Sequence, residues 1–220
     1  MIVAIDGPAG AGKSTVARKL AARLGIGYLN TGSMYRALTL LALNGGVALD
    51  DEAALATLAR THTIGLTATP AGDRVTLDGE NVTDEVRVPS VTEAVSHVAV
   101  HRAVRAEIVA LQQGVLTVGD WVADGRDIGS VVCPSADLKV FLTAAPEVRA
   151  ERRHAELAAG GDDVALGDVL QDITRRDAID STRAESPLVV APGAVVIDSS
   201  GLSIDEVVER ISALVGGAKT

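Results

Sequence analysis

Nine residues near the N-terminus decide the fold class: Gly7-Pro8-Ala9-Gly10-Ala11-Gly12-Lys13-Ser14-Thr15. An apolar run at residues 2–6 precedes them, and a run with helical spacing of apolar side chains follows at residues 16–24. A strand, a glycine-rich turn and a helix form the context in which G-x-x-x-x-G-K-[ST] binds phosphate. We therefore expect a P-loop here. A glycine-rich turn that matches by chance is the alternative, and the complete spacing disfavours it.

The chemistry of this stretch suits a nucleoside triphosphate. Glycines let the backbone N–H groups turn inward around a phosphate, and the start of the next helix also favours an anion. Lys13 is expected to reach the β- and γ-phosphates, and Ser14 to offer its hydroxyl to Mg²⁺.

Composition narrows the class of protein. The chain has 220 residues, which suits one domain with insertions. Hydrophobic residues make up 47% and aromatic residues only 2%, so an aliphatic core around a buried parallel sheet is expected. The net charge of −9 argues against nucleic acid and anionic membranes as partners.

Cysteine content and hydropathy indicate the cellular compartment in which the protein is expected. Cys133 is the single cysteine, so no internal disulfide forms. We see no signal-peptide pattern and no apolar run of membrane-spanning length, so a cytoplasmic protein is expected. No long apolar stripe is left over after the core is assigned, which favours a monomer.

Periodicity predicts alternating strands and helices with one interruption. Residues 63–84 alternate around a turn at Pro70–Asp73, which predicts an inserted β-hairpin and a third short strand. A capping box at residues 90–93 predicts one helix that continues to about Gln113. Thr31 and Ser33 are candidate caps of the helix to about Leu43, and Asp50 of a helix to about Arg60. The five expected strands lie at residues 2–6, 28–30, 121–123, 138–142 and 194–198.

Charged side chains gather where ligands bind in α/β proteins. The segment Asp124-Gly125-Arg126-Asp127 follows a strand, and so lies at the edge where open parallel sheets bind ligands. Arg36 lies early in a helix, where the dipole does not favour a cation. A glycine-jointed helical hairpin at residues 146–182 carries Arg149, Arg152 and Arg153 and is a candidate lid.

The second helix of that hairpin presents charged side chains on one face. Arg176, Asp180 and Arg183 are spaced i, i+4 and i+7. They form either a clamp on a polyanion or a ladder of intrahelical ion pairs.

Taken together, these segments resemble the bacterial cytidylate (CMP/dCMP) kinases of the nucleoside monophosphate kinase family. The resemblance rests on the P-loop, Thr31-Gly32-Ser33-Met34-Tyr35-Arg36, Asp124-Gly125-Arg126-Asp127-Ile128-Gly129 and the R-D-x-x-D-x-x-R run from Arg176. It covers essentially the whole chain, including the β-rich insertion. The P-loop alone is generic, and the combination is specific.

The resemblance implies an α/β fold of the P-loop NTPase type: a five-stranded parallel sheet with helices on both faces, a small β-rich insertion and a helical lid. It implies a single kinase domain over residues 1–220, with a core (about 1–30, 85–145 and 183–220), a monophosphate-binding region (about 31–84) and a lid (about 146–182). The implied reaction is in-line transfer of the γ-phosphoryl group of ATP to CMP or dCMP, with Mg²⁺ as cofactor, giving CDP or dCDP.

The resemblance also implies roles for individual residues. ATP is expected on Gly7, Pro8, Ala9, Gly10, Ala11, Gly12, Lys13, Ser14 and Thr15, and Mg²⁺ near Ser14 and Asp124, through water at least in part. The residues implied for CMP are Arg36 and Arg126 at its phosphate, Ser96, Arg105 and Asp127 at cytosine, Arg176 and Asp180 at the ribose, Arg183 at a phosphate, and Thr31. The implied catalytic set is Lys13, Arg36, Arg126, Arg152, Arg153 and Arg183. Asn30 departs from the family, which often carries Asp there.

Three other functions remain open. The chain could be a different small-acceptor P-loop kinase, such as an adenylate or shikimate kinase. A GTP-dependent switch would need an N-K-x-D segment, and the sequence has none. A regulatory module would bind ATP without turning over any monophosphate.

Overall fold

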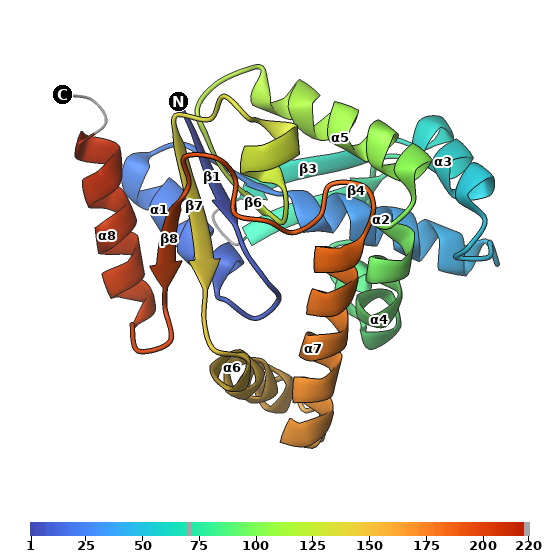
Figure 1. The fold of residues 1–220 in the computed structure, drawn as a ribbon. Coiled ribbons are helices and arrows are strands. Elements are labelled where there is room, and N and C mark those ends of the chain that lie inside the picture. The colour runs from blue at the N-terminus through green and yellow to red at the C-terminus, as the bar shows by residue number, and fades with distance from the viewer. Residues whose placement is uncertain (70–71, 218–220) are drawn as a thin grey trace.

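The computed structural model describes residues 1–69 and 72–217. Its main sheet has five parallel strands in the order β2-β6-β1-β7-β8 (Figure 1). The strands are β1 (Ile2–Asp6), β2 (Gly27–Asn30), β6 (Trp121–Gly125), β7 (Leu138–Thr143) and β8 (Val195–Asp198). The predicted five-stranded parallel sheet is confirmed.

The register of β1 and β6 sets the position of the site. Ile5 lies opposite Asp124, and Asp6 lies opposite Gly125. Parallel strands end at a common edge, so the loop after β1 and the loop after β6 emerge side by side. The P-loop is thereby placed next to Arg126 and Asp127.

Helices cover both faces of the sheet. On one face, α1 (Lys13–Leu24) and α8 (Ile204–Gly217) pack over Val3 and Ile5. On the other, α2 (Thr31–Asn44), α4 (Pro89–Val98) and α5 (Arg102–Leu116) share a core with Ala4. Side chains of β1 alternate between the two cores, as the pleat requires.

The β-rich insertion forms its own small sheet. After α3 (Glu52–Thr61), the strands β3 (Ile64–Thr69), β4 (Gly72–Leu77) and β5 (Glu80–Asn81) pair antiparallel. This confirms the predicted hairpin and third strand, whereas Pro70 and Ala71 of the predicted turn lie outside the described residues. A short helix, η1 (Glu85–Arg87), then leads to α4.

The helical hairpin consists of α6 (Pro146–Ala159) and α7 (Leu166–Thr182). The two helices pack on each other around Ala150, Val169 and Ile173, a cluster separate from the two cores of the sheet. Figure 1 shows them beyond the end of the sheet at which β7 finishes.

The structure corrects the helix predicted from residue 90 to residue 113. That segment is two helices, because α4 ends at Val98 and α5 begins at Arg102. The break is held by side chains: Arg105 donates to the Ala99 carbonyl (3.3 Å), and a ring nitrogen of His101 lies 2.8 Å from the Leu49 carbonyl oxygen. No glycine or proline marks it in the sequence.

Smaller predictions about helix ends were also wrong. The capping box at residues 90–93 does not form, and α4 instead begins at Pro89 after Val88. The cap of α3 is Asp51 rather than Asp50. Asn30, not Thr31 or Ser33, caps α2, since its side-chain oxygen accepts the Ser33 N–H (3.2 Å). A short π-helix, η2 (Ile128–Val132), was not predicted. Within the described residues, no helix is long and apolar enough to span a membrane.

Candidate active site

The P-loop wraps from the end of β1 to the start of α1. Gly12 precedes α1 in the left-handed conformation with φ 87°, which glycine adopts without strain. Gly7 must lack a side chain, because a Cβ atom there would lie 2.0 Å from the Leu142 carbonyl oxygen. Lys13 folds back and donates to the Pro8 carbonyl (2.7 Å). The Lys13 side chain therefore links the end of the loop back to its beginning.

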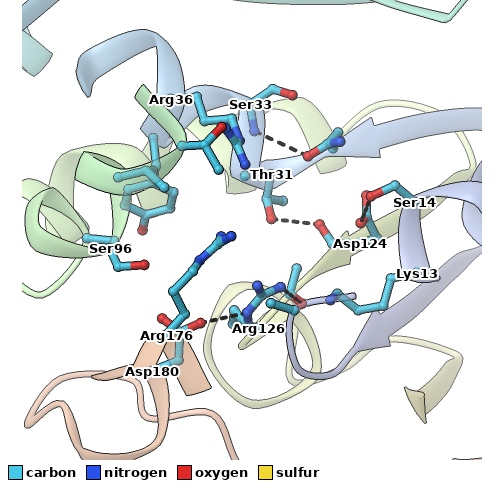
Figure 2. A pocket seen from close by; sticks show the side chains of 18 of the residues that line it. Lys13, Ser14, Thr31, Ser33, Arg36, Ser96, Asp124, Arg126, Arg176 and Asp180 are labelled. Carbon is cyan, nitrogen blue, oxygen red and sulfur yellow. Dashed lines mark hydrogen bonds and ion pairs between the residues drawn. The ribbon is translucent and has the colours of Figure 1, made fainter. Parts of the chain in front are cut away.

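Asp124 organises the side of the pocket nearest Ser14. Its carboxylate accepts hydrogen bonds from Ser14 Oγ (2.7 Å) and from the Tyr28 hydroxyl (2.8 Å), and its carbonyl accepts one from Thr31 Oγ1 (2.7 Å). Figure 2 shows the Ser14 and Thr31 contacts. Burial raises the pKa of Asp124, and Lys13 opposes that shift.

Two oxygen-bearing side chains on this side of the pocket are candidate ligands for Mg²⁺. Ser14 and Asp124 supply hard oxygen ligands, which Mg²⁺ prefers. In the described part of the chain, no group of three or more His, Cys, Asp and Glu residues could hold a metal. The residues therefore suit an ion held mostly by substrate phosphates and water, with one or two protein oxygens.

Opposite the P-loop, guanidinium groups line the same cavity of about 420 Å³. Arg36 donates to Thr92 Oγ1 (2.7 Å), and Arg126 donates through Nε to Asp180 (2.8 Å). Burial, followed by the charges of Arg176, Arg153, Arg126 and Arg87, lowers the pKa of Arg36 to about 9. So many like charges around one cavity favour an anionic ligand.

A second corner of the cavity is built around Asp127. Arg105 forms an ion pair with one carboxylate oxygen, and an Arg183 nitrogen lies 3.9 Å from the other. Arg105 also lies over the Tyr35 ring, 5.4 Å from its centroid. Arg105 and Asp127 are 4% and 5% exposed, so this is a buried polar corner.

Several buried polar atoms in the cavity lining have no hydrogen-bond partner. Leaving a buried donor unpaired costs about 1–3 kcal/mol, so native proteins rarely tolerate it without a ligand or water. The atoms are Tyr35 Oη, Arg105 Nε, Arg176 Nε and Arg183 Nη2. All four atoms belong to residues that line the cavity, so the polar groups around it are incompletely paired within the protein.

Comparison with known proteins decides between the kinase classes. A sequence model of cytidylate kinases matches residues 3–216. The chain belongs to the cytidylate kinase family. It is 50% identical over 218 residues to the cytidylate kinase of Pelotomaculum thermopropionicum (99% of this chain, 96% of that protein). It is 51% identical over 213 residues to the cytidylate kinase of Geobacillus kaustophilus (97% of this chain, 95% of that protein). The chain is thus a phosphotransferase.

Solved structures support the fold alone. A protein from Eubacterium ventriosum superposes with a TM-score of 0.54 at 11% identity, covering 98% of each chain. A shikimate kinase from Bacteroides thetaiotaomicron gives a TM-score of 0.50 at 12% identity, again over 98% of each chain.

For a cytidylate kinase, the cavity gathers most of the residues that the sequence predicted. Gly7, Pro8 and Ala11 belong to the loop but do not line the cavity, and Arg152 lies away from it. Arg152 instead donates to Ser199 Oγ (3.1 Å) and to the Ser199 carbonyl (2.7 Å). The predicted residues that line the cavity are Ala9, Gly10, Gly12, Lys13, Ser14, Thr15, Thr31, Arg36, Ser96, Arg105, Asp124, Arg126, Asp127, Arg153, Arg176, Asp180 and Arg183.

Sequence reasoning missed other members of the lining. Arg18, Tyr35, Arg87, Thr92 and Glu156 all face the cavity. Tyr35 could have been predicted from the sequence, because it directly precedes Arg36 in the Thr31–Arg36 segment. Thr92 lies 56 residues after Arg36 in the sequence. No local sequence pattern therefore indicates the hydrogen bond between their side chains.

Proposed function

We propose that this chain transfers the γ-phosphoryl group of ATP to CMP and dCMP, giving CDP or dCDP and ADP, with Mg²⁺ as cofactor. One observation carries the proposal: the P-loop and an arginine-rich half-site line the same cavity. A donor and an acceptor phosphate bound there would face each other, as in-line transfer requires.

The P-loop holds the donor in this proposal. Backbone N–H groups and Lys13 bind the β- and γ-phosphates. Burial, followed by the charge of Arg126, lowers the pKa of Lys13, and bound phosphates would favour its ammonium form. Ser14 and Asp124 would hold Mg²⁺, which when bound neutralises charge on the donor phosphates.

The acceptor needs no strong general base, because its phosphate is already an anionic nucleophile. Catalysis is then positioning and charge neutralisation. Arg36 and Arg126 approach the cavity from α2 and from the loop after β6, and would hold the α-phosphate from two sides (Figure 2). Arg183 supplies a further cation from the end of α7.

The buried corner would bind the nucleoside. The Asp127 carboxylate accepts from the N4 amino group of cytosine, whereas the carbonyl of uracil would face it without a hydrogen. Ser96 and Arg105 would complete the base contacts, and Arg176 and Asp180 would contact the ribose. Arg153, on α6, would cover the transferring group and help exclude water, with Arg152 joining on closure.

A panel of acceptors tests the proposal. Purified protein is given ATP and Mg²⁺ with CMP, dCMP, UMP, AMP or shikimate, and ADP is measured by a coupled assay. We expect CMP and dCMP to give the highest kcat/KM, and chromatography to show the matching diphosphates. Turnover highest on AMP or shikimate would overturn the substrate assignment, and ATP binding without turnover on any acceptor would overturn the enzymatic proposal.

A further inference from the structure

The helix that carries the acceptor contacts also contacts the P-loop. On α7, Arg176, Asp180 and the following Arg183 line the cavity, whereas Asp177 does not. Asp177 Oδ1 accepts the backbone N–H of Ala9 (3.3 Å), and Asp177 Oδ2 accepts from Arg149 (2.5 Å). A carboxylate next in sequence to Arg176 is therefore bonded to the donor loop.

Arg149 completes this connection from the helix α6. Its side chain donates to the Ala9 carbonyl (3.0 Å) and to the Ala144 carbonyl (2.9 Å). Both the N–H and the carbonyl of Ala9 are thus held by one partly buried ion pair. Gly10 packs directly against Arg149, since a Cβ atom on Gly10 would lie 3.0 Å from the Arg149 Cβ and carbonyl oxygen.

The cluster is placed to resist small displacements. Arg149 is 4% exposed, and the Asp177 side chain is 21% exposed. Charge-assisted hydrogen bonds are stronger than neutral ones, and more so where water is largely excluded. A shift of α7 against the P-loop would stretch both hydrogen bonds of Asp177 at once.

We propose that Asp177 is a positioning residue that couples the acceptor site to the donor site, an inference that rests on the proposed function. Acceptor bound to Arg176 and Asp180 fixes α7, and α7 fixes Ala9 through Asp177 and Arg149. By thermodynamic linkage, ATP in the P-loop then raises the affinity for CMP by the factor by which CMP raises the affinity for ATP. Asp177 itself touches neither substrate.

Titration calorimetry with Mg²⁺ and a non-hydrolysable ATP analogue tests the coupling. The analogue is titrated into the protein with and without CMP, and the ratio of the two dissociation constants is the linkage. Coupled sites typically show ratios of about 5 to 150. For Asp177→Asn, which keeps the shape and loses the charge, we expect the ratio to approach 1 while the dissociation constant of CMP alone stays unchanged.

Turnover gives a second readout. A small misplacement of the donor loop can cost up to about 10²-fold in rate, so kcat should fall in Asp177→Asn. Because CMP then binds the ATP-bound enzyme without the benefit of the linkage, the KM for CMP at saturating ATP should rise as well. Asp168→Asn is the matched control, because Asp168 is an exposed carboxylate on the same helix and lines no described cavity.

The outcomes separate this inference from the proposed function. A wild-type protein without CMP kinase activity contradicts the proposed function. A wild-type protein with activity and linkage, together with an Asp177→Asn variant that keeps the full linkage ratio, overturns only the coupling. If Asp177→Asn unfolds, Arg149→Lys, which keeps a cation opposite Asp177 but cannot form the same set of bonds, is measured in its place, and an unchanged ratio there has the same meaning.

Discussion

Single residues of the cavity carry charges that are largely removed from water. Arg105 and Asp127 are buried as an ion pair, and Arg105 Nε still lacks a partner. Ion pairs of this kind contribute little to stability, because desolvation offsets their attraction. The base recognition proposed above would account for a buried ion pair in the corner of a cavity.

The first prediction concerns base selection by Asp127. In Asp127→Ala, the acceptor for the cytosine amino group is lost, and so is the unpaired carboxylate that disfavours uracil. A hydrogen bond to a charged group is worth about 1.5–3 kcal/mol, so the preference for CMP over UMP should fall roughly 10- to 100-fold. The measurement is the ratio of kcat/KM for the two monophosphates.

Asp50→Ala serves as the control, since Asp50 is exposed and does not line the cavity. It should leave the ratio unchanged. Because Asp127→Ala leaves Arg105 buried without its partner, thermal unfolding should be recorded for both variants. A folded Asp127→Ala protein with the wild-type ratio would remove Asp127 from base recognition.

The start of a helix could be predicted from the sequence where neighbouring residues alone determine it. The helix α6 begins at Pro146 as predicted. At the start of α8, the stretch Ser203-Ile204-Asp205-Glu206 has the spacing of a capping box and forms one, because Ser203 and Glu206 are bonded reciprocally. The break between α4 and α5 could not be predicted, because it depends on Arg105 reaching Ala99 and on His101 reaching a different segment. The contact of Arg152 with Ser199 could not be predicted for the same kind of reason, since the two residues lie 47 positions apart in sequence.

The second prediction concerns the contact between the P-loop and α6. Gly10→Ala introduces a Cβ atom at φ 74° and drives it against Arg149, whereas Gly161→Ala introduces one at φ 93° with nothing within 4 Å. Both variants carry the backbone strain of a left-handed residue, about 1–2 kcal/mol. Gly10→Ala alone adds overpacking of about 1–3 kcal/mol.

Urea unfolding and ATP binding measure the two effects. We expect Gly10→Ala to be the less stable variant and to bind ATP more weakly, while Gly161→Ala binds ATP like the wild type. Equal stability and equal ATP affinity in the two variants would show that the loop and α6 do not depend on each other.

At the scale of the whole molecule, the sequence was sufficient to predict the sheet and the edge of the sheet at which the cavity lies. Aliphatic strands with few aromatic residues predicted a buried parallel sheet, and the segments after the strands at residues 2–6 and 121–123 supplied the site. What joins those two segments was not predicted. Asp6, at the end of β1, accepts the N–H groups of Ile128 (2.7 Å) and Gly129 (2.8 Å), and so ties the P-loop strand to the loop that carries Arg126.

The third prediction is that Asp6 makes the stability of the protein depend on pH. Burial raises its pKa to about 6 from 3.8, even though the two backbone hydrogen bonds act in the opposite direction. The folded protein therefore keeps a proton on Asp6 at pH values where the unfolded chain has released it. The stabilising contribution of this group is complete below pH 3.8 and is lost as the pH rises through about 6.

The difference in unfolding free energy between the wild type and Asp6→Asn isolates this contribution, because all other titrating groups are common to both proteins. The amide NH2 group of asparagine faces one of the two backbone N–H groups at every pH. This contact therefore changes the difference in unfolding free energy by an amount that does not depend on pH. Between pH 3.5 and pH 7, the advantage of the wild type should shrink by on the order of 3 kcal/mol. A difference that stays constant over this range would mean that Asp6 titrates alike in the folded and unfolded chains, and that its bonds to Ile128 and Gly129 offset its burial completely.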